Sequence, residues 1–258
     1  MDDLGGRVSL PQAAQRIVTL APHATELVVA AGAGDRLVGI AVGGAGHGRL
    51  SGLPRIGGPG GLDREALLTL QPDLVIAWQS GNRATDLEWI ARSGIALYQT
   101  EPGSLHDISR AVRDIGGLSG TTRQAEAAAR AFEQALDTPC ARLPPLAAYV
   151  SVWEHPAMTV GGRHWINAAL RSAGYRNVFD QLDRGVFPVS SEAALAHRLL
   201  PRISLVRSFD DSEDDRLADL LSRPGPGLGE AIPILCTRRL AQDPANTHKG
   251  DHPKPMLR

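Results

Sequence analysis

Short apolar runs alternate along the chain with segments in which apolar residues recur every three or four positions. In the first half, the runs with the length and composition of buried strands lie at residues 16–20, 37–41, 73–78 and 95–99. The segments with helical spacing lie at residues 24–31, 63–70 and 85–92. This alternation predicts the α/β class, with a largely parallel sheet covered by helices.

The most regular helical pattern lies at mid-chain. Residues 121–137 contain neither glycine nor proline, and the apolar residues recur at the spacing of one helical face, namely Ala125, Ala128, Ala129, Phe132 and Leu136. Prolines follow from Pro139 onward, where a helix would end. We predict one long helix here that joins two Rossmann-like lobes.

The pattern of strands and helices resumes after this helix, at residues 147–153, 158–160, 164–172 and 203–206. It predicts a second lobe that is shortened by a strand and a helix, because residue 206 is followed almost directly by the acidic segment 210–215 and then by the segment 219–223. The predicted domains are an N-terminal α/β lobe, a linking helix with its connection, a C-terminal α/β lobe and a flexible tail. Their bounds are residues 1–120, 121–143, 144–242 and 243–258.

Composition and charge limit the kinds of partner that the chain is expected to bind. The 27 basic residues nearly balance the 28 acidic ones, so nothing indicates binding to nucleic acid or to an anionic membrane. No apolar run approaches the roughly 20 residues that span a bilayer, and we expect no membrane insertion. Residues 1–15 lack the features of a signal peptide, so any export signal would have been removed or would lie outside this sequence.

The motifs that usually mark an enzyme do not occur. The sequence has no Gly-x-Ser-x-Gly elbow, no P-loop, and no Gly-x-Gly-x-x-Gly that opens a helix after a strand. We therefore predict a protein that is not an enzyme and requires no cofactor.

Three segments of the first lobe carry a resemblance to a known family. Residues 16–27, 53–57 and 70–78, in this spacing, resemble the periplasmic binding proteins of ABC importers for vitamin B12, haem and ferric siderophores. Within that class, residues 73–82 are similar to the subfamily that binds vitamin B12, and segments of the second lobe extend the similarity to about residue 200. The resemblance implies a monomeric periplasmic protein that holds a corrinoid, a cobalamin-like ligand, in the cleft between its lobes and delivers it to a membrane permease.

The resemblance also implies residues for the ligand. Trp78 would pack against the corrin ring, because a broad apolar ligand is held by large rigid surfaces, although a tryptophan that merely ends a buried strand is the alternative. Asp219 and Arg223 would bind the amide groups of the corrin rim, although four-residue spacing also fits an ordinary helical ion pair. His23 would be a polar cleft residue or a helix cap.

The chain has few aromatic residues for such a ligand, with four Trp, three Tyr and four Phe. A glycine-rich stretch at residues 42–48 replaces a segment that carries a ligand-packing tyrosine in the subfamily. We therefore expect Trp153 and Phe187 to extend the apolar wall, or the ligand to differ, with haem and ferric siderophores as the alternatives.

Permease docking in the family uses one surface glutamate on each lobe. Glu192 is similar to that of the second lobe, and the alternative is an acidic residue in the first turn of a helix capped by Ser190 or Ser191. The matching position of the first lobe is Ala84, so we expect nearby Asp86 or Glu88 to replace it.

Related two-lobed importers bind zinc or manganese through histidines and carboxylates. The candidate ligands here are His23, His47, His155 and His164. Each histidine fits a solvated or hydrogen-bonded role better, because His23 follows Pro22 in a turn and His155 and His164 lie in or beside loops. The cobalt of a corrinoid is a further partner for one of these histidines, although nothing in their spacing requires it.

The two cysteines leave a disulfide open on composition alone. By resemblance, Cys236 lies on a C-terminal helix whose usual partner position is occupied by Ala173. The resemblance therefore implies that the family's disulfide is absent and that Cys140 lies in the interlobe connection, away from that helix.

Overall fold

The computed structural model describes residues 1–43, 48–58, 61–207 and 212–242. These residues divide into two compact units, the first of residues 1–134 and 223–228, the second of residues 135–222 and from 229 onward. The division falls inside α5 (Thr122–Leu136), the long helix expected at mid-chain. The α/β class is confirmed, while the expected tail at 243–258 and His47 lie outside the described residues.

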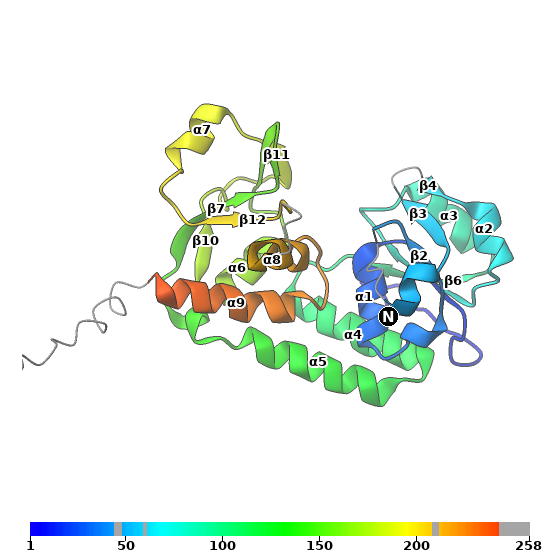
Figure 1. Ribbon diagram of the computed structural model, residues 1–258. Helices are drawn as coiled ribbons and strands as arrows, with labels where there is room; N and C mark the ends of the chain where they lie inside the picture. Colours follow the sequence, from blue (N-terminus) through cyan, green and yellow to red (C-terminus); the bar gives the residue numbers. More distant parts are fainter. Residues whose placement is uncertain (44–47, 59–60, 208–211, 243–258) are drawn as a thin grey trace, which may run out of the picture. The chain divides into compact units, whose positions relative to one another are not determined.

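The first unit is built on a six-stranded sheet with the order β4-β3-β2-β1-β5-β6 (Figure 1). Neighbouring strands are parallel except for the short hairpin of β3 and β4. The strands are β1 (Ile17–Thr19), β2 (Leu37–Ala41), β3 (Arg55–Gly58), β4 (Gly61–Leu62), β5 (Leu74–Trp78) and β6 (Ala96–Thr100). The order reverses between β1 and β5, and ligands of α/β proteins bind beyond the carboxyl ends of strands at such a switch point.

Helices cover both faces of this sheet (Figure 1). One face packs its core residues Val18 and Val75 against Leu67 and Leu87, from the two helices that cover it. Those helices are α2 (Arg64–Thr69) and α3 (Ala84–Arg92), and α1 (Pro22–Ala30) and α4 (Leu105–Ser119) cover the other face. Two short 3₁₀ turns, η1 (Gly34–Arg36) and η2 (Gly48–Gly52), complete the unit.

The helix α4 pairs with α5 as a helical hairpin. Gly120 adopts φ 69° at the end of α4, a left-handed conformation in which glycine carries no steric cost, and α5 begins two residues later. The Arg113 guanidinium then pairs with Glu126 at 2.7 Å and Glu133 at 2.6 Å. These side chains fix the register of the two helices.

The second unit holds two small sheets. One is parallel with the order β10-β7-β12, and the other is antiparallel with the order β11-β9-β8. The strands are β7 (Leu146–Ser151), β8 (Trp153–Glu154), β9 (Ala157–Val160), β10 (Tyr175–Asn177), β11 (Val186–Pro188) and β12 (Arg202–Ser204). The helices are η3 (Pro139–Arg142), α6 (Ile166–Ser172), α7 (Ser191–Ala196), α8 (Glu213–Leu221) and α9 (Leu228–Ala241).

A disulfide joins η3 to α9 within the second unit. Cys140 and Cys236 have Cα atoms 5.6 Å apart and lie 96 residues apart in sequence. The expectation that Cys140 lies away from the C-terminal helix is therefore wrong. The backbone of Cys140 packs against Gly174, immediately after position 173, so η3 brings a cysteine to the space beside Ala173. No helix among the described residues is long and apolar enough to cross a membrane.

Candidate functional site

The carboxyl ends of β1 and β5 bring His23 and Trp78 together in the first unit. Trp78 is the last residue of β5 and is half-buried, while His23 lies in the first turn of α1. Their rings meet edge to face, with centroids 5.1 Å apart. The backbone of Gly81 lies so close to the indole that a Cβ at this position would collide with it. The indole is therefore held between the His23 ring and the loop after β5.

Asn82 ties together the two loops at the switch point. Its side-chain amide donates to the carbonyl oxygen of Leu20 at 2.9 Å, and its Oδ1 accepts from the backbone N–H of Trp78 at 2.8 Å. One side chain thus connects the end of β1 to the end of β5, and the position of the indole is fixed before any ligand arrives. This role follows from a contact 62 residues away in sequence, which local patterns do not reveal.

His23 is neutral in this site. Its side chain is buried, and Nε2 lies 2.8 Å from Oγ1 of Thr100. The Thr100 hydroxyl donates to the Ala77 carbonyl at 3.0 Å, so Nε2–H of His23 is the donor to Thr100. Burial, and secondarily the positive charge of Arg223, lower the pKa of His23 to about 4. The ring is therefore an uncharged wall beside Trp78 at neutral pH.

We expect the buried His23 to make the fold sensitive to acid. The unfolded chain takes up a proton at His23 near pH 6.5 and the folded chain only near pH 4, so stability is full above pH 6.5 and falls as the pH drops toward 4. Between these two pH values, the free energy of unfolding that is lost through protonation of His23 is about 3 kcal/mol. In urea titrations at pH 7 and pH 4.5, His23→Gln should lose less stability than wild type, and an equal loss in both would contradict this role.

An ion pair lies next to His23. Nε of Arg223 and Oε1 of Glu26 are 2.6 Å apart, and their side chains are only 19% and 18% exposed. Arg223 reaches this place because residues 223–228 belong to the first unit, where Gly225 packs against Glu26 and His23. The sequence did not single out Glu26, although it lies three residues after His23 and so shares one side of α1 with it.

The structure does not support the interpretation of Asp219 and Arg223 as an ion pair on one face of a helix. α8 ends at Leu221, so Arg223 lies outside the helix that carries Asp219 and their spacing no longer implies a shared face. Asp219 instead lies 3.5 Å from Arg207 in the second unit. Of the predicted ligand residues, the structure thus brings His23, Trp78 and Arg223 together in the first unit.

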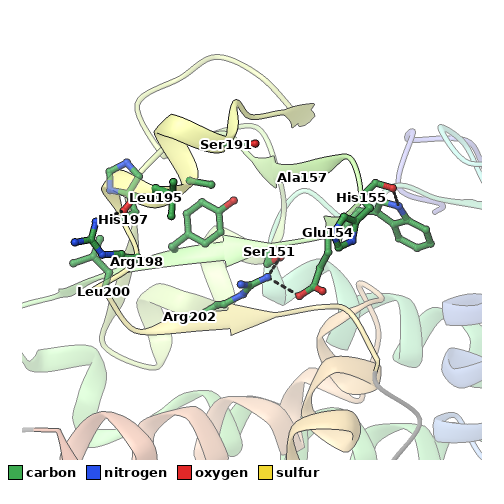
Figure 2. A pocket seen from close by; sticks show the side chains of 13 residues that line it. Ser151, Glu154, His155, Ala157, Ser191, Leu195, His197, Arg198, Leu200 and Arg202 are labelled. Carbon is green, nitrogen blue, oxygen red and sulfur yellow. Dashed lines mark hydrogen bonds and ion pairs between the residues drawn. The ribbon is translucent and has the colours of Figure 1, made fainter.

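The second unit carries a pocket of about 390 Å³ (Figure 2). Arg202 donates to the Ser151 hydroxyl at 2.9 Å and to the Glu154 carboxylate at 2.8 Å, which fixes its guanidinium in the pocket. Figure 2 shows Leu195 and His197 at the opposite end from Glu154. The lining residues are Tyr149, Ser151, Trp153, Glu154, His155, Ala157, Ser191, Ala194, Leu195, His197, Arg198, Leu200 and Arg202.

Trp153 and Phe187 have different surroundings in this unit. Trp153, on β8, is 57% exposed and donates from its indole N–H to the His155 carbonyl at 2.9 Å. Phe187, on β11, meets Phe179 edge to face at 5.8 Å, and the Arg184 guanidinium lies 5.6 Å from its ring centre. Trp153 therefore presents an open apolar surface, whereas Phe187 is part of a packed aromatic cluster.

The candidate docking carboxylates also differ. Glu192 is exposed in the first turn of α7, whose start is capped by the Ser190 hydroxyl, and it makes no ion pair with any residue that the structure describes. Asp86 is 8% exposed, accepts from the backbone N–H of Leu62 and pairs with Arg64 at 2.9 Å. Glu88 is largely exposed, so the geometry favours Glu88 over Asp86 as a surface carboxylate of the first unit.

Three of the histidines considered as metal ligands, His23, His155 and His164, lie within the described residues. No group of three or more His, Cys, Asp or Glu side chains within residues 1–43, 48–58, 61–207 and 212–242 is arranged to hold a metal ion. His164 is largely buried, its Nδ1 accepts from the N–H of Ile166 at 3.3 Å, and burial lowers its pKa to about 4. His164 is therefore a partly buried, hydrogen-bonded histidine of the second unit.

Residues 17–231 match the family model described as periplasmic binding protein. The vitamin B12-binding protein of Vibrio parahaemolyticus is 32% identical over 244 residues, which cover 86% of this chain and 88% of that protein. The corresponding protein of Vibrio cholerae is 28% identical over 247 residues, covering 88% and 90%.

Solved structures extend the likeness to the fold. The periplasmic vitamin B12-binding protein of Vibrio cholerae superposes with a TM-score of 0.78 at 27% identity, covering 90% of this chain and 99% of that one. A periplasmic haem-binding protein from Pseudomonas aeruginosa gives a TM-score of 0.73 at 22% identity, covering 89% and 94%. At that lower identity the haem-binding structure shows a shared fold alone.

Proposed function

Because the chain belongs to the periplasmic binding protein family, as its sequence predicted, we propose that it is the substrate-binding protein of an ABC importer that captures a corrinoid and delivers it to a membrane permease. The observation that carries this proposal is the 32% identity, over most of both chains, to a vitamin B12-binding protein. The family consists of substrate-binding transport proteins. We further propose a monomer of the periplasm that catalyses no reaction and needs no cofactor.

Trp78 supports a ligand with a broad apolar face. It ends β5 at the switch point of the first sheet, where α/β proteins bind ligands, and Asn82 and His23 hold it in place. A large rigid ring is the kind of surface that packs well against a tetrapyrrole. Arg223 lies near His23, whose ring contacts Trp78. Its guanidinium supplies a polar group for amides at the rim of a corrin.

The predicted residues of the second unit enter the proposal with unequal support. Trp153 is exposed and lines a pocket, so it is the better candidate for a further apolar contact. Phe187 would serve a ligand mainly by supporting its aromatic neighbours. Asp219 keeps a partly exposed carboxylate beside Arg207, which leaves it a candidate for a weaker polar contact.

Titration of the purified protein tests the ligand class directly. Cyanocobalamin and dicyanocobinamide should both bind with saturation in calorimetry and quench tryptophan fluorescence. Saturable binding of haem with no binding of either corrinoid would contradict the proposal and assign the protein to the haem-binding branch. An absence of saturable binding by all three ligands would refute tetrapyrrole capture altogether.

We expect Glu192→Arg to impair uptake without changing ligand affinity. Glu192 is an exposed carboxylate on α7, and reversing a charge at the rim of an interface mainly slows or weakens association with the partner. Transport of labelled cobalamin with the cognate permease in proteoliposomes should fall several-fold, whereas the dissociation constant from calorimetry stays unchanged.

Glu65→Arg is the matched control. Glu65 is also an exposed acid in the first turn of a helix, α2, and reversing it changes the net charge by the same amount. If both variants slow uptake equally, the effect comes from net charge and Glu192 has no docking role. Glu88→Arg tests the corresponding carboxylate of the first unit in the same assay.

A further inference from the structure

We propose that Glu26 sets the ligand specificity of the site, by neutralising Arg223 so that a neutral, amide-rimmed ring is favoured over a ring that carries carboxylates. This inference rests on the proposed function, since it concerns the same site. Glu26 is not among the site residues predicted from the sequence. It acts on ligand specificity through Arg223.

The geometry of the pair carries the argument. A separation of 2.6 Å between Arg223 Nε and Glu26 Oε1 is that of a strong charge-assisted hydrogen bond. Both side chains are about four-fifths buried, so solvent screens their charges only weakly. A buried charge whose partner is removed is costly, and the two groups therefore hold each other in place.

A ligand carboxylate would meet this pair at a disadvantage. It would have to displace Glu26 from Arg223, or lie close to the Glu26 carboxylate and be repelled by a like charge. An amide oxygen can share the guanidinium with Glu26 without that repulsion. Tetrapyrroles differ in this respect, because the corrin ring of cobalamin carries amides at its rim, whereas haem carries two propionates.

The neighbouring histidine does not compensate for the lost positive charge. His23 is buried, donates through Nε2 to Thr100, and remains neutral at physiological pH. The Gly225 backbone closes against Glu26 and His23, so a residue with a side chain at position 225 would push the carboxylate away. The cluster of His23, Glu26 and Arg223 thus has no net charge where a carboxylate ligand would need a positive one.

Two ligands with the same ring isolate the rim chemistry. Dicyanocobinamide carries amides around the corrin, and dicyanocobyrinic acid carries carboxylates at the same positions. Wild type should bind the amide ligand more tightly. Glu26→Gln removes the carboxylate charge and keeps a hydrogen-bond acceptor, so affinity for the acid should rise at least about tenfold while affinity for the amide ligand changes less than about threefold.

Two further variants separate specificity from other effects. In the double variant Glu26→Gln/Arg223→Met, the increase in affinity for dicyanocobyrinic acid should disappear, because the guanidinium that would bind its carboxylates has been removed. Glu65→Gln, a matched loss of one exposed negative charge, should leave both affinities unchanged. An equal gain in Glu65→Gln, or an unchanged preference in a folded Glu26→Gln protein, overturns the proposal.

The same variants keep the inference testable if the ligand is haem. Haem and its dimethyl ester again share one ring and differ in two carboxylates, and Glu26→Gln should then favour haem selectively. Binding of haem alone would refute the corrinoid assignment while the ratio of haem to ester still tests Glu26. Binding of none of these rings by wild type or variants refutes both proposals.

Discussion

Trp78→Ala is expected to weaken cobalamin binding by at least roughly thirtyfold while the protein stays folded. Truncation of a central aromatic contact commonly costs about 2 kcal/mol or more of binding free energy, which corresponds to that factor. Trp78 is half-buried, and its ring is already fixed by His23, Gly81 and Asn82. Little conformational entropy is therefore lost when a ligand packs against it, and the contact contributes nearly its full value.

Trp89→Ala provides the matched control. Trp89 is a tryptophan of the same unit, but it lies on α3, packs against the core between that helix and the sheet, and stacks under the Arg64 guanidinium. Its loss should lower stability and leave cobalamin affinity unchanged. Circular dichroism and calorimetry of both variants check the two quantities, and a Trp78→Ala protein that binds as tightly as wild type would remove Trp78 from the site.

Replacing both cysteines by alanine should lower the free energy of unfolding by about 4 kcal/mol. The disulfide closes a loop of 96 residues, and in the chain-entropy account a loop of this length restricts the unfolded chain by that order of energy. Removal of a native disulfide from a small secreted domain typically costs about 2 to 5 kcal/mol. Urea unfolding of wild type and of Cys140→Ala/Cys236→Ala, compared at neutral pH, gives the difference.

The location of the disulfide supplies an internal control. Both cysteines belong to the second unit and are buried, so cobalamin contacts made by Trp78 should survive their loss. Proteolysis should first attack sites between residues 140 and 236 in the variant. If the free energies of unfolding of wild type and of the double variant differ by less than about 0.5 kcal/mol, residual structure already restricts the unfolded chain and the disulfide adds little to it.

Local patterns were sufficient for most elements of the first unit. The strands β1, β2, β5 and β6 lie within one or two residues of the predicted apolar runs. The runs of β1, β2 and β5 are rich in Val, Ile and Leu, as is usual for buried parallel strands, whereas β6 lies at the edge of the sheet and includes polar residues. The helix α4 was not predicted, although local signals for it are present: Ser104 and Asp107 form a capping box at its start, and Leu105, Ile108, Val112 and Ile115 recur at helical spacing. Its buried face packs against α1.

The site was predictable only where it follows the ends of strands. The sequence alone places Trp78 at the end of a buried strand. The strand order, which the structure supplies, shows that this strand lies at the switch point of the sheet. The partner of Arg223 is 197 residues away on α1, and the partner of Cys140 is 96 residues away on α9. Such pairings depend on how elements far apart in sequence are brought together, which no local spacing encodes. The burial of Asp86 by Arg64 has the same origin.

Residues 223–228 complete the first unit although the chain on both sides of them belongs to the second. A gene fragment that stops at residue 134 would therefore encode a first unit without Arg223 and without the backbone that covers Glu26 and His23. Recombination between relatives at a single breakpoint inside α5 would pair the face of α1 from one parent with residues 223–228 of the other. For protein engineers, swapping specificity modules requires three crossovers, near residues 134, 222 and 228, in place of one.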